Sequence, residues 1–176
     1  VGEGTVFWIE LSLCDAPQFD ALQAESATLP RPAARAGAPV HTLLYIEDNP
    51  ANLQLVEALI ARRPELRLLS AADGNLGIAL AREFLPEVIL MDINLPGING
   101  IEVMQILRAD PATAHIPIVA ISANVIPTDI KKGLEAGFFR YLTKPIVVNE
   151  FMDALSVALD FAAAAARDEA EKEPIQ

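Results

Sequence analysis

One short apolar segment constrains the fold of this chain more than any other. Residues Val88–Met91 are all apolar, and they lead into Asp92 and a loop that contains Pro96 and Gly97. An apolar run of this length, closed by proline and glycine, is typical of a fully buried strand that ends in a turn. A charged residue at the end of a buried strand usually has a functional role, so Asp92 is a candidate functional residue.

The same pattern of a strand followed by polar residues recurs along the chain. An apolar strand at 42–46 ends in the acidic pair Glu47-Asp48, and one at 140–142 runs into Lys144 and Pro145. Strands are also predicted at 67–71 and 118–121. The first helix is predicted to start at Asn49-Pro50, a capping residue followed by proline. Four further helices are predicted near 75–83, 100–109, 128–136 and 149–165.

Five such strand–helix units in succession predict an α/β fold with a doubly wound parallel sheet, because parallel strands need crossover connections. Right-handed crossovers place the carboxyl ends of all strands at one edge, where ligands of such sheets bind. The residues expected to meet there are Glu47, Asp48, Asp92, Ser122 and Lys144.

Three carboxylates at one edge need positive charge. Two like charges about 4 Å apart cost about 4 kcal/mol at an effective dielectric constant of about 20. Lys144 supplies one positive charge, and Mg²⁺, which prefers a few oxygen ligands and retains waters, would supply the rest. The alternative is structural: an acidic helix cap at Asp48 and a salt bridge from Asp92 to Lys144. The gathering of all these groups at one edge favours a metal and phosphoryl site.

Composition excludes several classes of protein. The net charge of −11 argues against direct binding of nucleic acid. No apolar run reaches the roughly 18 residues of a membrane span, so no membrane contact is expected. Cys14 is the single cysteine, which is consistent with a cytoplasmic location. The chain begins with Val1 and has no signal peptide, so we interpret it as a fragment of a longer protein, and a membrane anchor is expected only in that parent protein.

The segment from Thr42 to Leu159 resembles the receiver domain of two-component response regulators. The resemblance rests on Glu47-Asp48, on Asp92 followed by 94–100 (Asn-Leu-Pro-Gly-Ile-Asn-Gly), on Ile121-Ser122-Ala123 and on Lys144-Pro145. It implies a flavodoxin-like (βα)5 fold with strand order 2-1-3-4-5.

The resemblance also implies a role for each site residue. Asp92 would take a phosphoryl group from phosphohistidine. Mg²⁺ would be held by Asp48, Asp92 and the backbone carbonyl of Asn94, with Glu47 in the outer shell.

The remaining family residues would act on the phosphoryl group and report it. Lys144, aimed by a cis bond to Pro145, would neutralise its charge. Ser122 would then bind a phosphoryl oxygen, and Tyr141 would swing inward as a switch that partners read.

The N-terminal residues indicate the context. The segment Gly2-Glu3-Gly4-Thr5-Val6-Phe7 resembles the last strands of the ATPase domain of sensor histidine kinases. We therefore predict a kinase remnant over 1–14, a flexible linker over 15–40, a receiver domain over 41–165 and an acidic tail over 166–176. The expected protein is the C-terminal receiver of a hybrid histidine kinase, without kinase activity of its own.

The expected partners follow from that context. They are a histidine kinase, in the same polypeptide, and a histidine phosphotransfer protein; the family also often dimerises. A free single-domain response regulator is the alternative within the family. A phosphatase with an aspartyl nucleophile usually needs a second acid where this chain has Asn94, and a binding-only pseudo-receiver would not need the intact acids, hydroxyl and lysine. A Rossmann domain would need a glycine-rich turn at 47–50.

Overall fold

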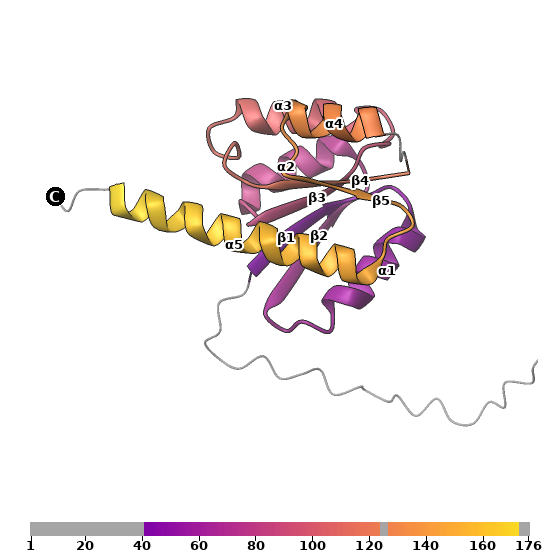
Figure 1. Cartoon of the computed structure of the whole chain (residues 1–176), viewed down its shortest axis with the longest axis horizontal. Coiled ribbons are helices and arrows are strands. Elements are labelled where there is room, and N and C mark those ends of the chain that lie inside the picture. The colour runs from indigo at the N-terminus through magenta and orange to yellow at the C-terminus, as the bar shows by residue number, and fades with distance from the viewer. Residues whose placement is uncertain (1–40, 124–126, 173–176) are drawn as a thin grey trace, which may run out of the picture. The chain divides into compact units, whose positions relative to one another are not determined.

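The computed structural model describes residues 41–123 and 127–172. The predicted kinase remnant and linker lie outside the described residues. Strands and helices alternate along the described chain, and their bounds follow the predicted ones closely except at the end of α5 (Figure 1). They are β1 (His41–Ile46), α1 (Pro50–Ile60), β2 (Leu66–Ala71), α2 (Gly74–Phe84), β3 (Val88–Asp92), α3 (Gly100–Ala109), β4 (Ile118–Ser122), α4 (Pro127–Ala136), β5 (Arg140–Thr143) and α5 (Val148–Lys172).

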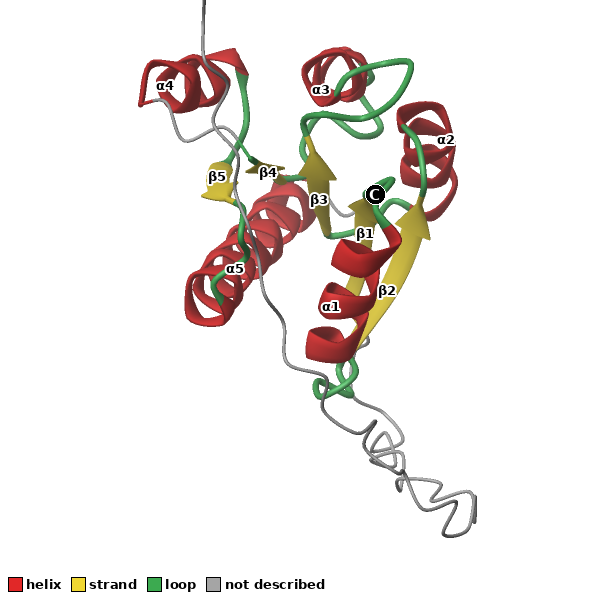
Figure 2. Ribbon diagram, turned by 90° about the vertical axis from the view of Figure 1, so that its right-hand side faces the viewer, coloured by secondary structure: helices red, strands yellow, loops and turns green. Residues whose placement is uncertain are grey.

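The five strands form one parallel sheet in the order β2-β1-β3-β4-β5, which confirms the predicted flavodoxin-like topology. Helices α1 and α5 cover one face, and α2, α3 and α4 cover the other (Figure 2). The central strands β3 and β4 are buried along their whole length, as expected for strands covered on both faces.

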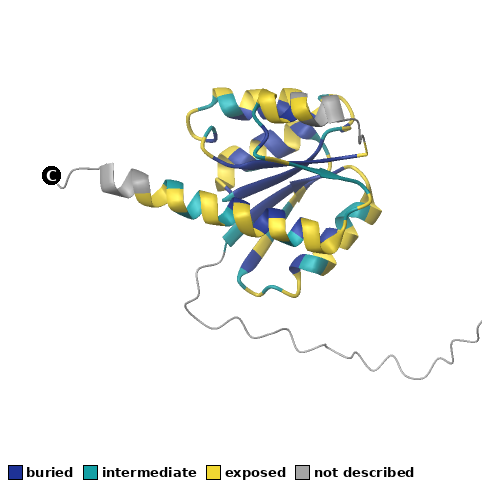
Figure 3. Cartoon of the chain, in the orientation of Figure 1, coloured by how far each residue is buried: buried dark blue, intermediate teal, exposed yellow. Residues whose placement is uncertain are grey.

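Alternate residues of the central strands fill the two layers of the core. On one side, Ile46 and Met91 pack with Val103 and Met104 of α3. On the other side, Leu90 packs with Phe151 and Leu155 of α5 and with residues of α1. Figure 3 shows the central strands as a buried layer, while the edge strands β2 and β5 are partly exposed. The sheet is therefore a rigid base for the residues that follow its strands.

Helix starts are fixed by local capping. Asn49 accepts a hydrogen bond from the Ala51 N–H with Pro50 in the first turn, as predicted. Asn99 and Glu102 form a capping box at the start of α3. These caps set where the loops after β1 and β3 end and the helices begin.

Helix α5 differs from the prediction. It was expected to end at Ala165 and to be followed by an acidic tail, but it continues to Lys172 and runs beyond the end of the sheet (Figure 1). Residues 162–166 are all alanine, the best helix former, so local propensity carries the helix past the sheet contacts. Across the described ranges, no helix has the length and hydropathy needed to span a membrane.

Candidate functional site

The site lies at the carboxyl-terminal edge of the sheet, where backbone pairing continues past the strand ends. The Glu47 N–H donates to the Ala71 carbonyl (2.9 Å), the Ile93 N–H to the Ile121 carbonyl (3.2 Å), and the Lys144 N–H to the Ser122 carbonyl (2.7 Å). Because each strand end is tied to its neighbour, the side chains that follow β1, β3 and β5 are held at one place.

Three carboxylates meet there. One oxygen from each of Glu47, Asp48 and Asp92 lies within 4.8 Å of the others; Glu47 and Asp92 are buried and Asp48 is exposed. The Asn94 N–H donates to Asp92 Oδ1 at 2.9 Å, so the backbone of Asn94 also lies at the site. A set of oxygen donors with one side open to solvent fits Mg²⁺.

Lys144 joins two of these acids. Its Nζ lies 2.6 Å from Asp92 Oδ2, 2.8 Å from Glu47 Oε2 and 3.1 Å from Glu47 Oε1. The salt bridge that the structural alternative required is thus present, but it belongs to a larger cluster. Burial alone would lower the pKa of Lys144, yet hydrogen bonds to Asp92 and Glu47 raise it above its ordinary value.

Glu47 receives more hydrogen bonds than the sequence indicated. Tyr45 donates its hydroxyl to Oε2 (2.6 Å), and Asn52 Nδ2 (3.0 Å) and the Asn49 N–H (3.3 Å) donate to Oε1. Burial would raise the pKa of Glu47, but donation from Lys144, Tyr45 and Asn52 lowers it. Burial raises the pKa of Tyr45 further above its ordinary value, and its bond to Glu47 adds to this, so the hydroxyl stays protonated and donating.

Sequence reasoning missed Tyr45 and Asn52 as site residues. The signals were their positions. Tyr45 lies in β1 two residues before Glu47, and extended backbone places residues two apart on the same face. Asn52 lies in the first turn of α1, five residues after Glu47.

Ser122 and Tyr141 occupy the predicted neighbouring strands. Ser122 is buried at the end of β4, one residue beyond Ile121, which pairs with Asp92 of β3. Tyr141 pairs with Ala120 from β5 and lies half-buried against the core. The bond from Lys144 to Pro145 is cis, as the family resemblance predicted.

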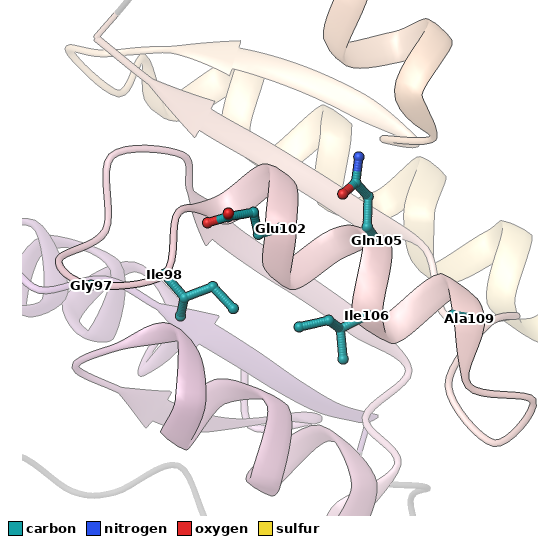
Figure 4. A pocket seen from close by; sticks show the side chains of 6 residues that line it. All are labelled: Gly97, Ile98, Glu102, Gln105, Ile106 and Ala109. Carbon is teal, nitrogen blue, oxygen red and sulfur yellow. The ribbon is translucent and has the colours of Figure 1, made fainter.

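A separate groove lies on the outer surface of α3 (Figure 4). It has a volume of about 630 Å³ and is lined by Gly97, Ile98, Glu102, Gln105, Ile106 and Ala109. None of the acidic cluster or its donors contributes to it, so the chemistry of the site and this surface are distinct.

Comparison with known proteins gives a consistent result. A sequence model of the response regulator receiver domain matches residues 43–156. PilH of Pseudomonas aeruginosa is 32% identical over 117 residues, which cover 66% of this chain and 96% of PilH. The response regulator PleD of Caulobacter vibrioides is 39% identical over 104 residues, which cover 59% of this chain but only 23% of PleD.

Solved structures show the same fold. The receiver domain of the sensor histidine kinase PA1611 from P. aeruginosa, with a magnesium ion coordinated in its active-site cleft, aligns with a TM-score of 0.61 and 30% identity, covering 70% of this chain and 98% of that domain. The chemotaxis response regulator CheY4 of Vibrio cholerae aligns with a TM-score of 0.63 and 23% identity, covering 68% of this chain and 99% of CheY4.

Proposed function

The chain belongs to the family of response regulator receiver domains, and on this premise we propose that it is the phosphoacceptor of a two-component phosphorelay. In this proposal Asp92 takes a phosphoryl group from a phosphohistidine. The observation that carries it is Asp92 itself: a buried carboxylate 2.6 Å from Lys144 Nζ, within a cluster of carboxylates at the edge of a parallel sheet.

The transfer is a displacement at phosphorus. An oxygen of Asp92 forms the new P–O bond as the P–N bond to histidine breaks, and the histidine nitrogen keeps the electron pair of that bond. Asp48, Asp92 and the carbonyl of Asn94 would hold Mg²⁺, which supplies positive charge to the phosphoryl oxygens when bound. Lys144 can carry one charge to the same oxygens because its ammonium already lies against Asp92.

The signal would leave the site through Ser122 and Tyr141. Ser122 ends the strand beside Asp92, so its hydroxyl is suited to bind a phosphoryl oxygen. Tyr141 lies on the next strand, and its ring is the switch that a partner would read at the surface of α4 and β5.

Gly133 of α4 gives a test of this switch. A Cβ at Gly133 would lie 3.1 Å from two ring carbons of Tyr141, so the half-buried ring rests against the helix backbone. Gly133→Ala should move the ring outward. Alanine in a helix is ordinarily more stable than glycine by about 1 kcal/mol, so we expect the substitution to raise the melting temperature in a Tyr141→Ala background and not in the parent.

The ring itself can be followed by fluorine NMR of the chain labelled with fluorotyrosine. The chain has two tyrosines, and the fully buried Tyr45 serves as an internal reference. Greater solvent exposure of the Tyr141 signal in Gly133→Ala is expected. An unchanged Tyr141 signal, with equal stabilisation in both backgrounds, would show that Gly133 does not constrain the ring.

We further propose that the chain is a receiver of a hybrid histidine kinase. The organisation is a kinase remnant over 1–14, a linker over 15–40 and the receiver from 41, with its own kinase and a histidine phosphotransfer protein as partners. The PA1611 domain, itself the receiver of a sensor kinase, supports this context. A free single-domain regulator is the second candidate, because PilH matches over 96% of its own length.

Phosphoryl uptake tests the proposed function. The chain is incubated with acetyl phosphate and Mg²⁺, and intact mass is followed with time. We expect a gain of one phosphoryl group per chain, lost when a chelator removes the metal. A folded chain that gains no phosphoryl group, or gains it equally with chelator, would contradict the proposal.

A further inference from the structure

We propose that Tyr45 and Asn52 are positioning residues that hold the Glu47 carboxylate turned toward Lys144 and away from direct contact with the metal. The inference rests on the proposed function, in which Mg²⁺ and the phosphoryl group meet at Asp92. It assigns a task to two side chains that the sequence did not connect with the site.

The contacts of Glu47 are arranged as a clamp. Oε2 accepts from Tyr45 (2.6 Å) and Lys144 (2.8 Å), while Oε1 accepts from Asn52 (3.0 Å) and Lys144 (3.1 Å), with the Asn49 N–H at 3.3 Å. An ionised carboxylate offers about four lone-pair positions. All are taken by donors, so Glu47 can bind a cation directly only if a donor leaves.

Burial makes the clamp hard to open. Tyr45 is 0% exposed, the Glu47 side chain is 0% exposed, and the tyrosine hydroxyl donates to Glu47. If Glu47 rotated away, a buried hydroxyl would lose its partner without gaining water. The strand and the first turn of α1 thus fix the direction of the carboxylate from two sides.

This direction matters because Glu47 is close enough to compete for the metal. One of its oxygens lies within 4.8 Å of oxygens of Asp48 and Asp92, and glutamate reaches one methylene further than aspartate. Turned toward Lys144, Glu47 anchors the ammonium beside Asp92 instead. The cation site then keeps two direct carboxylates and open positions for water and a phosphoryl oxygen.

The test is a split between metal affinity and reaction rate. In Tyr45→Phe combined with Asn52→Leu, Glu47 loses two donors and is free to turn to the metal. We expect calorimetric titration to show that the double variant binds Mg²⁺ about tenfold tighter than the parent. This difference corresponds to the free energy of one hydrogen bond to a charged group. At saturating Mg²⁺, uptake from acetyl phosphate should be slower, because Lys144 has lost its anchor. Tyr45→Phe alone should show both changes at smaller size.

Thr113→Val is the matched control. Thr113 is also 0% exposed, and its hydroxyl donates to the Leu107 carbonyl at 2.7 Å outside the site. Thr113→Val removes a buried hydrogen bond, as the double variant does, but away from the site. Neither the Mg²⁺ affinity nor the rate of phosphoryl uptake should therefore change. Weaker or unchanged Mg²⁺ binding in the double variant, or a parallel fall of affinity and rate, would overturn the inference.

The metal titration also separates this inference from the proposed function. If the parent takes up no phosphoryl group, the proposed function fails, and the titration alone decides: tighter Mg²⁺ binding by the double variant supports the clamp. If the parent binds no Mg²⁺, both the proposed metal site and the clamp are overturned.

Discussion

Lys144→Met is expected to slow phosphoryl uptake about 100-fold, the typical effect of removing one preorganised donor from a developing charge. The ammonium lies 2.6 Å from Asp92 Oδ2, and the Lys144 side chain is only 18% exposed, so water does not replace it well. The rate is measured at saturating Mg²⁺ and acetyl phosphate, because a loss that persists at saturation reflects the reaction rather than binding.

The same substitution should lower stability when no metal is present. Glu47 and Asp92 would be left as buried like charges, and we expect a loss of about 3 kcal/mol in the free energy of unfolding. Because the pKa of Lys144 is raised and that of Glu47 is lowered in the folded chain, this difference is fully present between the ordinary pKa values of the two groups. It disappears as pH rises through the raised lysine pKa, and it is lost as pH falls through the lowered glutamate pKa. Added Mg²⁺ should recover part of it.

Lys131→Met is the control for Lys144→Met. Lys131 also pairs with a carboxylate, that of Glu135, but both side chains are exposed. An exposed ion pair of this kind contributes little to stability. The phosphoryl uptake rate and the free energy of unfolding of Lys131→Met should therefore stay near those of the parent. Equal behaviour of the two lysine variants would contradict the assigned role of Lys144.

Gly100→Ala is expected to damage both the fold and the site. A Cβ at Gly100 would lie 2.5 Å from the Asp92 carbonyl oxygen and 2.8 Å from Ile93 Cα, both in the backbone. The end of β3 or the start of α3 must therefore move. We expect a loss of about 3 kcal/mol in the free energy of unfolding, as overpacking typically costs, together with slower uptake because Asp92 is displaced.

Gly97→Ala separates this effect from that of glycine replacement in general. Gly97 has φ of +79° and nothing within 4 Å of its Cβ position. Alanine there should cost about 1 kcal/mol for the left-handed backbone and leave uptake unchanged. Chemical denaturation measures both losses; a Gly100→Ala chain as stable as the parent would show that the loop after β3 yields easily.

Much of the fold follows from sequence pattern, because each strand is a short apolar run bounded by turn residues. The run before Asp92 is buried as predicted, and the helix after Glu47 starts at the predicted cap. The strand order was implied by family resemblance, since strand alternation alone does not specify which strands are neighbours.

The features that the sequence did not predict depend on information that a local sequence pattern does not contain. Helix α5 passes its expected end because helix propensity acts where the sheet no longer does. Tyr45 reads as a core residue, and only the three-dimensional structure shows that its hydroxyl meets Glu47 while Asn52 meets the same carboxylate from α1.

The central claim is that Asp92 is the phosphoacceptor, and reductive trapping tests it most directly. After incubation with acetyl phosphate and Mg²⁺, borohydride converts an aspartyl phosphate to homoserine, and peptide mass spectrometry locates that residue. We expect homoserine at position 92 and none in Asp92→Asn, with the exposed Asp153→Asn variant behaving like the parent. Homoserine at another position, or continued trapping in Asp92→Asn, would contradict the account.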